Sequence, residues 1–337
     1  MKENRLVTYS IVFIALVLLA IVLKTFQSVM RPLAIAALLL FLFTPLAQFS
    51  RDRKIPVWLT FGGFFVIVFL ILSFVGSFIS VDNVNLKDAL PRFQERISQN
   101  SSGLIELGAK LGYDLEDVTT DKAGKMAVTG LTMGLGAIRT LFSEILLAMI
   151  LMMFLIQSRS GLFSWVEQRY GTDEVTRLQE TFQKIQGDIL AYVGTKTLMS
   201  LGTAIVIGIV LLLFKAKFIY VSLLIIFLLN YIPIIGSLIA VLIVLLLYVL
   251  TIGLSVKVLY LFVLLMAVQV LFGSILEPKI AGSRLNMSPI LIILSLYVWG
   301  WIWGVIGMLL SVPLTILIMI VSRHVGHMKS PPVLDPD

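Results

Sequence analysis

The sequence contains no cysteine, and only 13% of its 337 residues are charged. The missing thiols exclude disulfides, thiolate catalysis and cysteine metal sites. Soluble globular domains carry about 25% charged and about 45–50% apolar residues, whereas the hydrophobic share here is 59%. So few charges leave no room for a soluble catalytic domain, and the composition is that of a polytopic membrane protein.

The sequence also lacks the short motifs that carry much of enzyme chemistry. It has no G-x-S-x-G, H-E-x-x-H or Walker A segment, so neither hydrolysis nor ATP-driven pumping is indicated, and no cofactor is expected. The pair His324 and His327 has no carboxylate or cysteine beside it and does not predict a metal site. The net charge of +7 comes from basic residues scattered at membrane boundaries, where topology explains them, so no nucleic-acid partner is expected.

Six apolar runs approach the roughly 20 residues needed to cross a bilayer. They are Leu6 to Leu23, Leu33 to Phe49, Val57 to Ser80, Leu141 to Ile156, Leu198 to Phe214 and Val258 to Leu276. The first run follows Lys2 and Arg5 as a signal peptide would, but it lacks a small-residue cleavage pattern and is predicted to be a retained span.

Two further apolar runs are too long for one span. Phe218 to Leu250 and Pro289 to Val321 each correspond to about 50 Å of helix at 1.5 Å per residue. Each run carries helix breakers near its middle, "NYIPIIG" in the first and "GWIWGVIG" in the second. We therefore predict two hairpins of short half-helices, with single tilted spans as the alternative.

Basic residues in short loops predict the orientation. The segment "SRDRK" at residues 50–54 and the basic C-terminal tail both favour the cytoplasm under the positive-inside rule. The predicted organisation is a three-helix membrane region (1–80), an extracytoplasmic helical segment (81–140), a fourth span (141–157), a cytoplasmic amphipathic region (158–197), a transport core (198–323) and a cytoplasmic tail (324–337).

In this topology the core holds a span plus a hairpin, followed by a second span plus hairpin of opposite sense. Many secondary transporters build their substrate site from such inverted repeats with broken helices. Irregular backbone is tolerated there only where its freed polar groups face a cavity or packed protein. The predicted fold is thus an all-α membrane protein of about eight segments, two of them re-entrant helical hairpins that form an inverted repeat.

Three ordered C-terminal motifs carry a family resemblance. "NYIPIIGSLIA", "LEPKIAGSRLNMSP" and "GWIWGVIGMLLSVPLTIL" resemble the pattern of the autoinducer-2 exporter (AI-2E) family of bacterial membrane proteins. The positions that match the family pattern are Asn230, Pro233, Gly236, Pro278, Gly282, Pro289, Gly304, Gly307 and Pro313. The chain departs from the pattern at Ser288, where the family usually has His or a similar residue.

The resemblance implies an efflux permease of the bacterial inner membrane that tends to form homo-oligomers. Some members export the polar furanone autoinducer-2, and others exchange Na⁺ or Li⁺ for H⁺. A neutral furanone needs hydrogen-bonding groups, whereas cation exchange needs a carboxylate within the membrane. The apolar spans hold few carboxylates, among them Glu144 and Glu277, so we favour the small polar solute and keep the Na⁺(Li⁺)/H⁺ antiporter as the alternative.

The candidate substrate or ion pathway collects polar residues and helix breakers of the core. It comprises Asn230, Pro233, Gly236, Gln269, Glu277, Pro278, Gly282, Ser283, Arg284, Asn286, Pro289, Gly300, Gly304 and Gly307. Each has a structural reading as well: the prolines terminate helices, the glycines allow close helix packing, and Glu277 pairs with Lys279 or Arg284. A non-transporting membrane scaffold, in which the breaks serve packing alone, is the rival class.

The segment Thr172 to Val193 is predicted to be an amphipathic helix. Its apolar residues recur every three or four positions, at Val175, Leu178, Phe182, Ile185, Ile189 and Tyr192. Such a stripe must be covered, either by the rest of the chain or by a second subunit.

Overall fold

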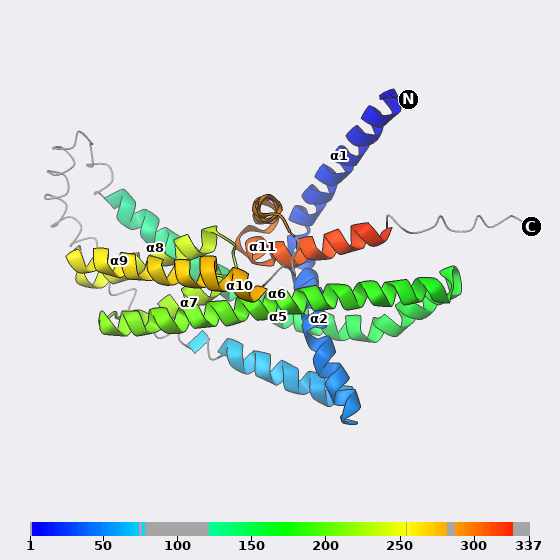
Figure 1. Ribbon diagram of the computed structural model, residues 1–337, viewed down its shortest axis with the longest axis horizontal. Coiled ribbons are helices and arrows are strands. Elements are labelled where there is room, and N and C mark those ends of the chain that lie inside the picture. Colours follow the sequence, from blue (N-terminus) through cyan, green and yellow to red (C-terminus); the bar gives the residue numbers. More distant parts are fainter. Residues whose placement is uncertain (1, 74–75, 78–120, 254, 282–286, 326–337) are drawn as a thin grey trace, which may run out of the picture. The chain divides into compact units, whose positions relative to one another are not determined.

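The computed structural model describes residues 2–73, 76–77, 121–253, 255–281 and 287–325, and all regular secondary structure in these ranges is helical. The helices are α1 (Lys2–Thr25), α2 (Gln27–Asp52), an unlabelled helix (Val57–Ser73), α5 (Asp121–Tyr170), α6 (Thr172–Leu213), α7 (Ile219–Leu229), α8 (Ile235–Ile252), α9 (Val256–Gln269), the π-helix η1 (Val270–Leu276), α10 (Glu277–Ala281) and α11 (Pro289–Val325) (Figure 1). The predicted all-α class is confirmed.

Five helical stretches in the described ranges are long and apolar enough to cross a membrane: Gln27–Asp52, Arg139–Tyr170, Thr172–Leu213, Val256–Ile280 and Pro289–Ser322. Shorter apolar helices are Ser10–Thr25, Val57–Ser73, Ile219–Leu229 and Ile235–Val249. Helices suit this composition because they satisfy every backbone polar group internally in lipid. The count of eight membrane segments stays a prediction.

The chain divides into two compact units. The first unit comprises residues 1–65, 141–192 and 284–337, and the second comprises residues 66–140 and 193–283. The predicted site residues Gly282, Ser283, Arg284 and Asn286 lie outside the described residues, as does most of the predicted segment 81–140.

Two apolar clusters hold the first unit together. The larger one joins α2, α5 and α11 through Phe43, Met152 and Ile306, which are nearly fully buried. In the second cluster, Trp299 and Trp303 pack on α1 and α2, and the indole Nε1 of Trp303 donates a hydrogen bond of 3.0 Å to the carbonyl oxygen of Leu23. A buried indole is stable only when its N–H finds such an acceptor.

The predicted break in the second long run is confirmed at Gly304. This residue interrupts α11 with φ +66° and ψ −144°, a backbone conformation open in practice only to glycine. A Cβ on Gly307 would collide with the carbonyl oxygen of Trp299, so the two arms of α11 approach each other closely beside the bend. The run Pro289 to Val321 is therefore two helical arms rather than one straight rod.

Replacing Gly304 by alanine should destabilise the protein by about 1–3 kcal/mol, the cost of holding a side chain in a disallowed backbone region. The thermal midpoint of the purified protein in detergent measures the effect. Gly161→Ala is the matched control, since Gly161 lies in a helix with open space around the added carbon, and it should leave the midpoint unchanged or raise it. Equal midpoints for the two variants would show that position 304 tolerates a side chain and does not require glycine.

The amphipathic stripe on α6 is covered within the first unit. Ile185, Ile189 and Tyr192 are buried, and the ring of Phe182 lies 4.8 Å from that of Phe41 on α2. Of the two predicted coverings, packing within the chain is the one observed, and the stripe no longer requires a second subunit. The helix also continues without a break to Leu213, so the stripe and the predicted fifth span form a single helix.

The first long run is broken as predicted. Helix α7 ends at Leu229 and α8 begins at Ile235, and the two helices pack side by side in the second unit (Figure 1). With 11 residues, α7 is about 16 Å long and too short to cross a bilayer alone. Gly236 permits the reversal, because a Cβ there would collide with the carbonyl oxygen of Leu229.

Candidate functional site

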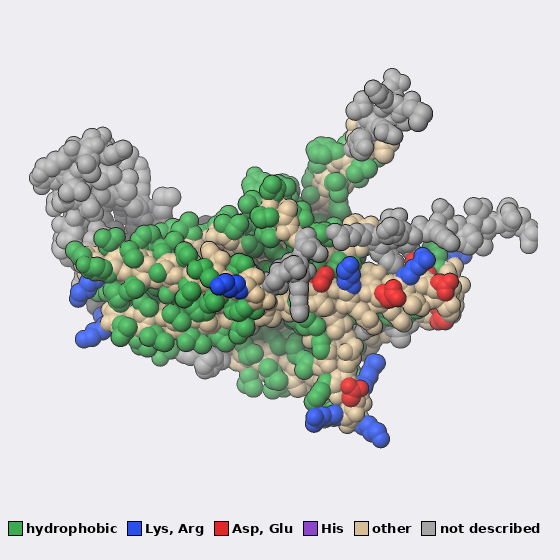
Figure 2. All heavy atoms as spheres, in the orientation of Figure 1, with side chains coloured by type: hydrophobic (Ala, Val, Ile, Leu, Met, Phe, Trp, Pro, Cys, Tyr) green, Lys and Arg blue, Asp and Glu red, His purple; other side chains and the backbone are tan. Residues whose placement is uncertain are grey.

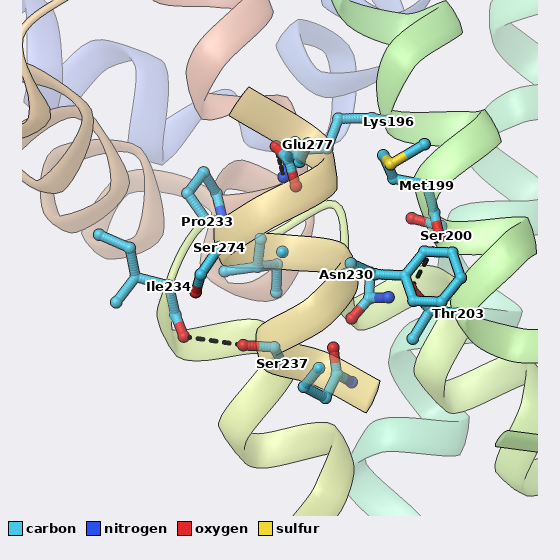
Figure 3. A pocket seen from close by; sticks show the side chains of 14 residues that line it. Lys196, Met199, Ser200, Thr203, Asn230, Pro233, Ile234, Ser237, Ser274 and Glu277 are labelled. Atoms are coloured by element: carbon cyan, nitrogen blue, oxygen red, sulfur yellow. Dashed lines mark hydrogen bonds and ion pairs between the residues drawn. The ribbon is translucent and has the colours of Figure 1, made fainter. Parts of the chain in front are cut away.

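The second unit contains a polar cavity of about 300 Å³. Figure 3 shows its three walls converging. Its lining comes from α6 (Lys196, Met199, Ser200, Thr203), from the α7–α8 turn and the start of α8 (Asn230, Ile232, Pro233, Ile234, Ser237), and from the α9–η1–α10 segment (Gln269, Phe272, Gly273, Ser274, Glu277). Hydroxyl, amide and charged groups are thus gathered in one cavity between three apolar helical segments.

One face of α6 forms the first wall of the cavity. Lys196, Ser200 and Thr203 are spaced by four and three residues, so they lie on one face of the helix. All three are buried. The hydroxyl of Thr203 donates a 2.8 Å hydrogen bond to the carbonyl oxygen of Met199, one turn earlier in the same helix. The α6 wall therefore presents a cation and a free hydroxyl in adjacent turns.

The α7–α8 turn is strained. Ile234 has φ +64° and ψ −59°, and the N–H of Ile235 donates to the carbonyl oxygen of Pro233 at 2.6 Å, which is the geometry of a three-residue γ-turn. A β-branched residue with positive φ is a clear outlier, and such strain gathers at functional sites. The turn is tied to α6 by a hydrogen bond of 2.6 Å between the hydroxyls of Tyr231 and Thr197.

The third wall is a π-helix. After Gln269 the chain follows η1 for seven residues before α10 begins. Wide π-turns are rare and occur frequently at functional sites. Pro278 stands just beyond η1, and its missing N–H removes the donor that an α-helix would use at i+4, in keeping with the wider π-turn. Ser274 of η1 lines the cavity, and its side chain adds a hydroxyl group to this wall.

Three polar atoms of the cavity wall have no hydrogen-bond partner among the described residues. They are the hydroxyl oxygen of Ser200, the amide oxygen Oδ1 of Asn230 and the amide nitrogen Nε2 of Gln269. Ser200 is 1% exposed and Gln269 is 7% exposed. Each unpaired buried polar group costs about 1–3 kcal/mol, so three of them in one cavity need an explanation, and a polar ligand supplies one.

Among the described residues that line the cavity, Glu277 supplies the one carboxylate, and an ammonium group holds it. Nζ of Lys196 lies 2.5 Å from Oε1 of Glu277, and the two side chains are 9% and 25% exposed. The structural alternative for Glu277 was an ion pair with Lys279 or Arg284. In the described structure its ion-pair partner is Lys196 on α6, and Arg284 lies outside the described residues. The ion pair ties α6 to α10 at the edge of the cavity (Figure 3).

The structure brings together four of the predicted residues, Asn230, Pro233, Gln269 and Glu277. Gly236 and Pro278 adjoin them in the chain. Pro289, Gly300, Gly304 and Gly307 belong to α11 in the first unit and do not line this cavity. Sequence reasoning missed Lys196, Ser200 and Thr203, although their polar spacing in an apolar helix was a signal that could have found them.

Comparison with known proteins decides the family. The model of the AI-2E family transporters matches residues 11–326. The chain belongs to the AI-2E transporter family. It is therefore a multi-span membrane protein of a bacterial transporter family, as the C-terminal motifs predicted.

Three relatives of this AI-2E chain match it over most of their own lengths. A chain of Borreliella burgdorferi named "Putative transport protein" is 29% identical over 95% of this chain and 88% of its own length. A protein of Escherichia coli K12 named "AI-2 transport protein TqsA" is 29% identical over 91% of this chain and 89% of its own. A Haemophilus influenzae relative is 26% identical over 88% of this chain and 87% of its own.

Proposed function

We propose that this AI-2E family member exports a small, uncharged, hydroxyl-rich solute of the autoinducer-2 type, and that the cavity of the second unit binds it. The observation that carries the proposal is a set of three polar atoms, on Ser200, Asn230 and Gln269, that have no hydrogen-bond partner within the described part of the chain. The relative named for autoinducer-2 transport supports the same solute class.

The chemistry of these atoms favours a neutral hydroxyl compound. The amide oxygen of Asn230 needs a donor, the amide nitrogen of Gln269 needs an acceptor, and the hydroxyl of Ser200 takes either role. A carboxylate ligand cannot donate to Asn230, and an ammonium ligand cannot accept from Gln269. A hydroxyl group donates and accepts, so a compound with several hydroxyls satisfies all three atoms.

We propose that transport proceeds by alternating access in the bacterial inner membrane, with both chain termini in the cytoplasm. Support comes from the two broken helices: the α7–α8 turn and the bend at Gly304 stand near the middle of the two long apolar runs. Discontinuous helices of this kind mark the substrate region of many secondary transporters. In this proposal the two hairpins are re-entrant and related by inversion, within a total of eight segments.

Cation exchange is less favoured by the same cavity. Exchange of a cation for a proton needs a carboxylate that can bind and release that proton, and Glu277 already accepts the ammonium of Lys196 at 2.5 Å. An incoming cation must therefore displace an amine that the fold holds in place. We assign the cavity to a neutral solute, and the sodium arm of the following experiment tests this assignment.

Flux from proteoliposomes tests the proposal. Liposomes with purified protein should release an enclosed furanone diol faster than empty ones, and added Na⁺ should leave an imposed pH gradient intact. Ser200→Ala should slow furanone release about two- to tenfold, the effect of one hydrogen bond of about 0.5–1.5 kcal/mol.

Ser295→Ala is the matched control, because Ser295 is also a buried serine in an apolar helix but lies in the first unit. It should release furanone at the wild-type rate. Absence of furanone flux would favour the rival class, a non-transporting membrane scaffold. Collapse of the pH gradient on addition of Na⁺ would favour the antiporter.

A further inference from the structure

The first unit contains a second cavity, of about 520 Å³, that the proposed transport does not use. It lies along α2 and α5 beside the corner where α2 ends. Two hydrogen bonds close that corner: the N–H of Ile55 donates to the carbonyl oxygen of Ser50, and the hydroxyls of Ser50 and Thr60 bond to each other. The lining residues are Leu40, Phe43, Thr44, Ala47, Gln48, Arg51, Val57, Ile156, Gln157 and Phe163.

The lining changes from apolar to cationic along α2. Leu40, Thr44, Gln48 and Arg51 follow one another at four- and three-residue spacing, so they share one face of the helix. From Leu40 to Arg51 the face spans about 16 Å at 1.5 Å per residue. Phe43 is buried at the apolar end, whereas Gln48 and Arg51 are exposed at the polar end. The cavity is thus amphipathic along its length.

The described lining of the cavity carries only positive charge, at its polar end. Arg51 is the only charged residue in the lining, and no ion pair to it is present in the described part of the chain. Asp52, Arg53 and Lys54 follow in the chain, so the segment keeps a net positive charge. Figure 2 shows Lys and Arg side chains gathered at the tip of α2, at the bottom of the view, beside a single acidic patch. The mouth of the cavity therefore attracts anions.

We propose that this cavity binds one anionic phospholipid, with its phosphate at Arg51 and an acyl chain against the apolar lining near Phe43 and Ile156. Basic pockets between membrane helices on the cytoplasmic side bind acidic lipid head groups, and the positive-inside rule places the segment "SRDRK" on that side. The amides of Gln48 and Gln157 supply donors for the phosphate and glycerol oxygens. A free phosphate ion matches Arg51 but leaves the apolar end of the cavity without a partner.

Native mass spectrometry of the detergent-purified chain tests this site. Titrations with phosphatidylglycerol and phosphatidylcholine should show preferential retention of phosphatidylglycerol. Arg51→Gln should weaken that retention about fivefold, the factor that corresponds to about 1 kcal/mol per basic residue. Arg53→Gln is the matched control, because Arg53 lies two residues away, does not line the cavity and stacks on Phe49 at 4.6 Å. It should retain the lipid as wild type does.

The apolar end has its own test. Ala47→Phe should fill the cavity and lower the retention of both lipids without changing the charge, and Ala47→Leu serves the same purpose if the larger residue prevents folding. Equal losses for Arg51→Gln and Arg53→Gln would overturn the proposal in favour of general surface charge. Displacement of the lipid by millimolar inorganic phosphate would also overturn the proposal, because it would indicate an anion site without an acyl chain. Full retention of the lipid in both Ala47 variants would overturn it as well.

Discussion

Replacing Gln269 by leucine should lower furanone flux by about tenfold to a hundredfold while leaving the protein as stable as wild type or more stable. The flux falls because the solute loses a hydrogen-bond donor in a buried cavity, an interaction of about 1–3 kcal/mol. Stability does not fall, because Nε2 of Gln269 has no partner to lose among the described residues and leucine fills a similar volume. Flux from proteoliposomes and the thermal midpoint measure the two effects.

The opposite directions of the two effects distinguish a binding residue from a structural one. A purely structural glutamine would lose stability and flux together when it is replaced. Gln183→Leu is the matched control, since Gln183 is exposed on α6 in the first unit, and it should leave flux unchanged. Wild-type flux in the Gln269→Leu variant would show that Gln269 does not bind the transported solute.

Replacing Glu144 by leucine should destabilise the first unit by about 3–5 kcal/mol, the cost of leaving a buried charge without its partner. An Nη atom of Arg31 on α2 lies 2.8 Å from Oε1 of Glu144 on α5, and the two side chains are only 18% and 10% exposed. The second carboxylate oxygen of Glu144 has no hydrogen-bond partner in the described structure, so the ion pair is its main compensation.

The double variant Arg31→Met, Glu144→Leu distinguishes the cost of losing the ion pair from the cost of leaving one buried charge without a partner. It should regain most of the lost stability, because apolar residues of similar volume often replace a buried ion pair at little cost. Thermal midpoints of the wild type, both single variants and the double variant form the cycle. Additive losses in the double variant would show that the two side chains do not depend on each other.

Helix breaks were predictable from sequence because they are local. The backbone freedom of glycine and the missing N–H of proline act within one helical turn. The turn at Asn230 to Gly236 and the bend at Gly304 were therefore found without a structure. The same reasoning placed Asn230 and Pro233 in the candidate site, and both line the cavity.

The partners of polar side chains were not predictable in this way. Pairing with nearby basic residues was the structural alternative for Glu277, but in the described structure Glu277 pairs with Lys196, which is 81 positions away in the chain. The hydroxyls of α6 gave an ambiguous pattern, because serine and threonine in apolar helices often bond to their own backbone, as Thr203 does here. A helical period shows that residues share a face, but it does not show which face looks into a cavity.

By itself the sequence determined the membrane class, the all-helical fold, the family and the positions of the two breaks, because hydrophobicity, Gly and Pro act through composition and short-range backbone geometry. Only the tertiary structure decided that α6 closes the polar cavity, that Lys196 holds Glu277, and that Ser200, Asn230 and Gln269 point unpaired atoms into one space. These facts depend on which distant segments pack together, and a polar group acquires its partner, or remains without one, only when that packing is complete.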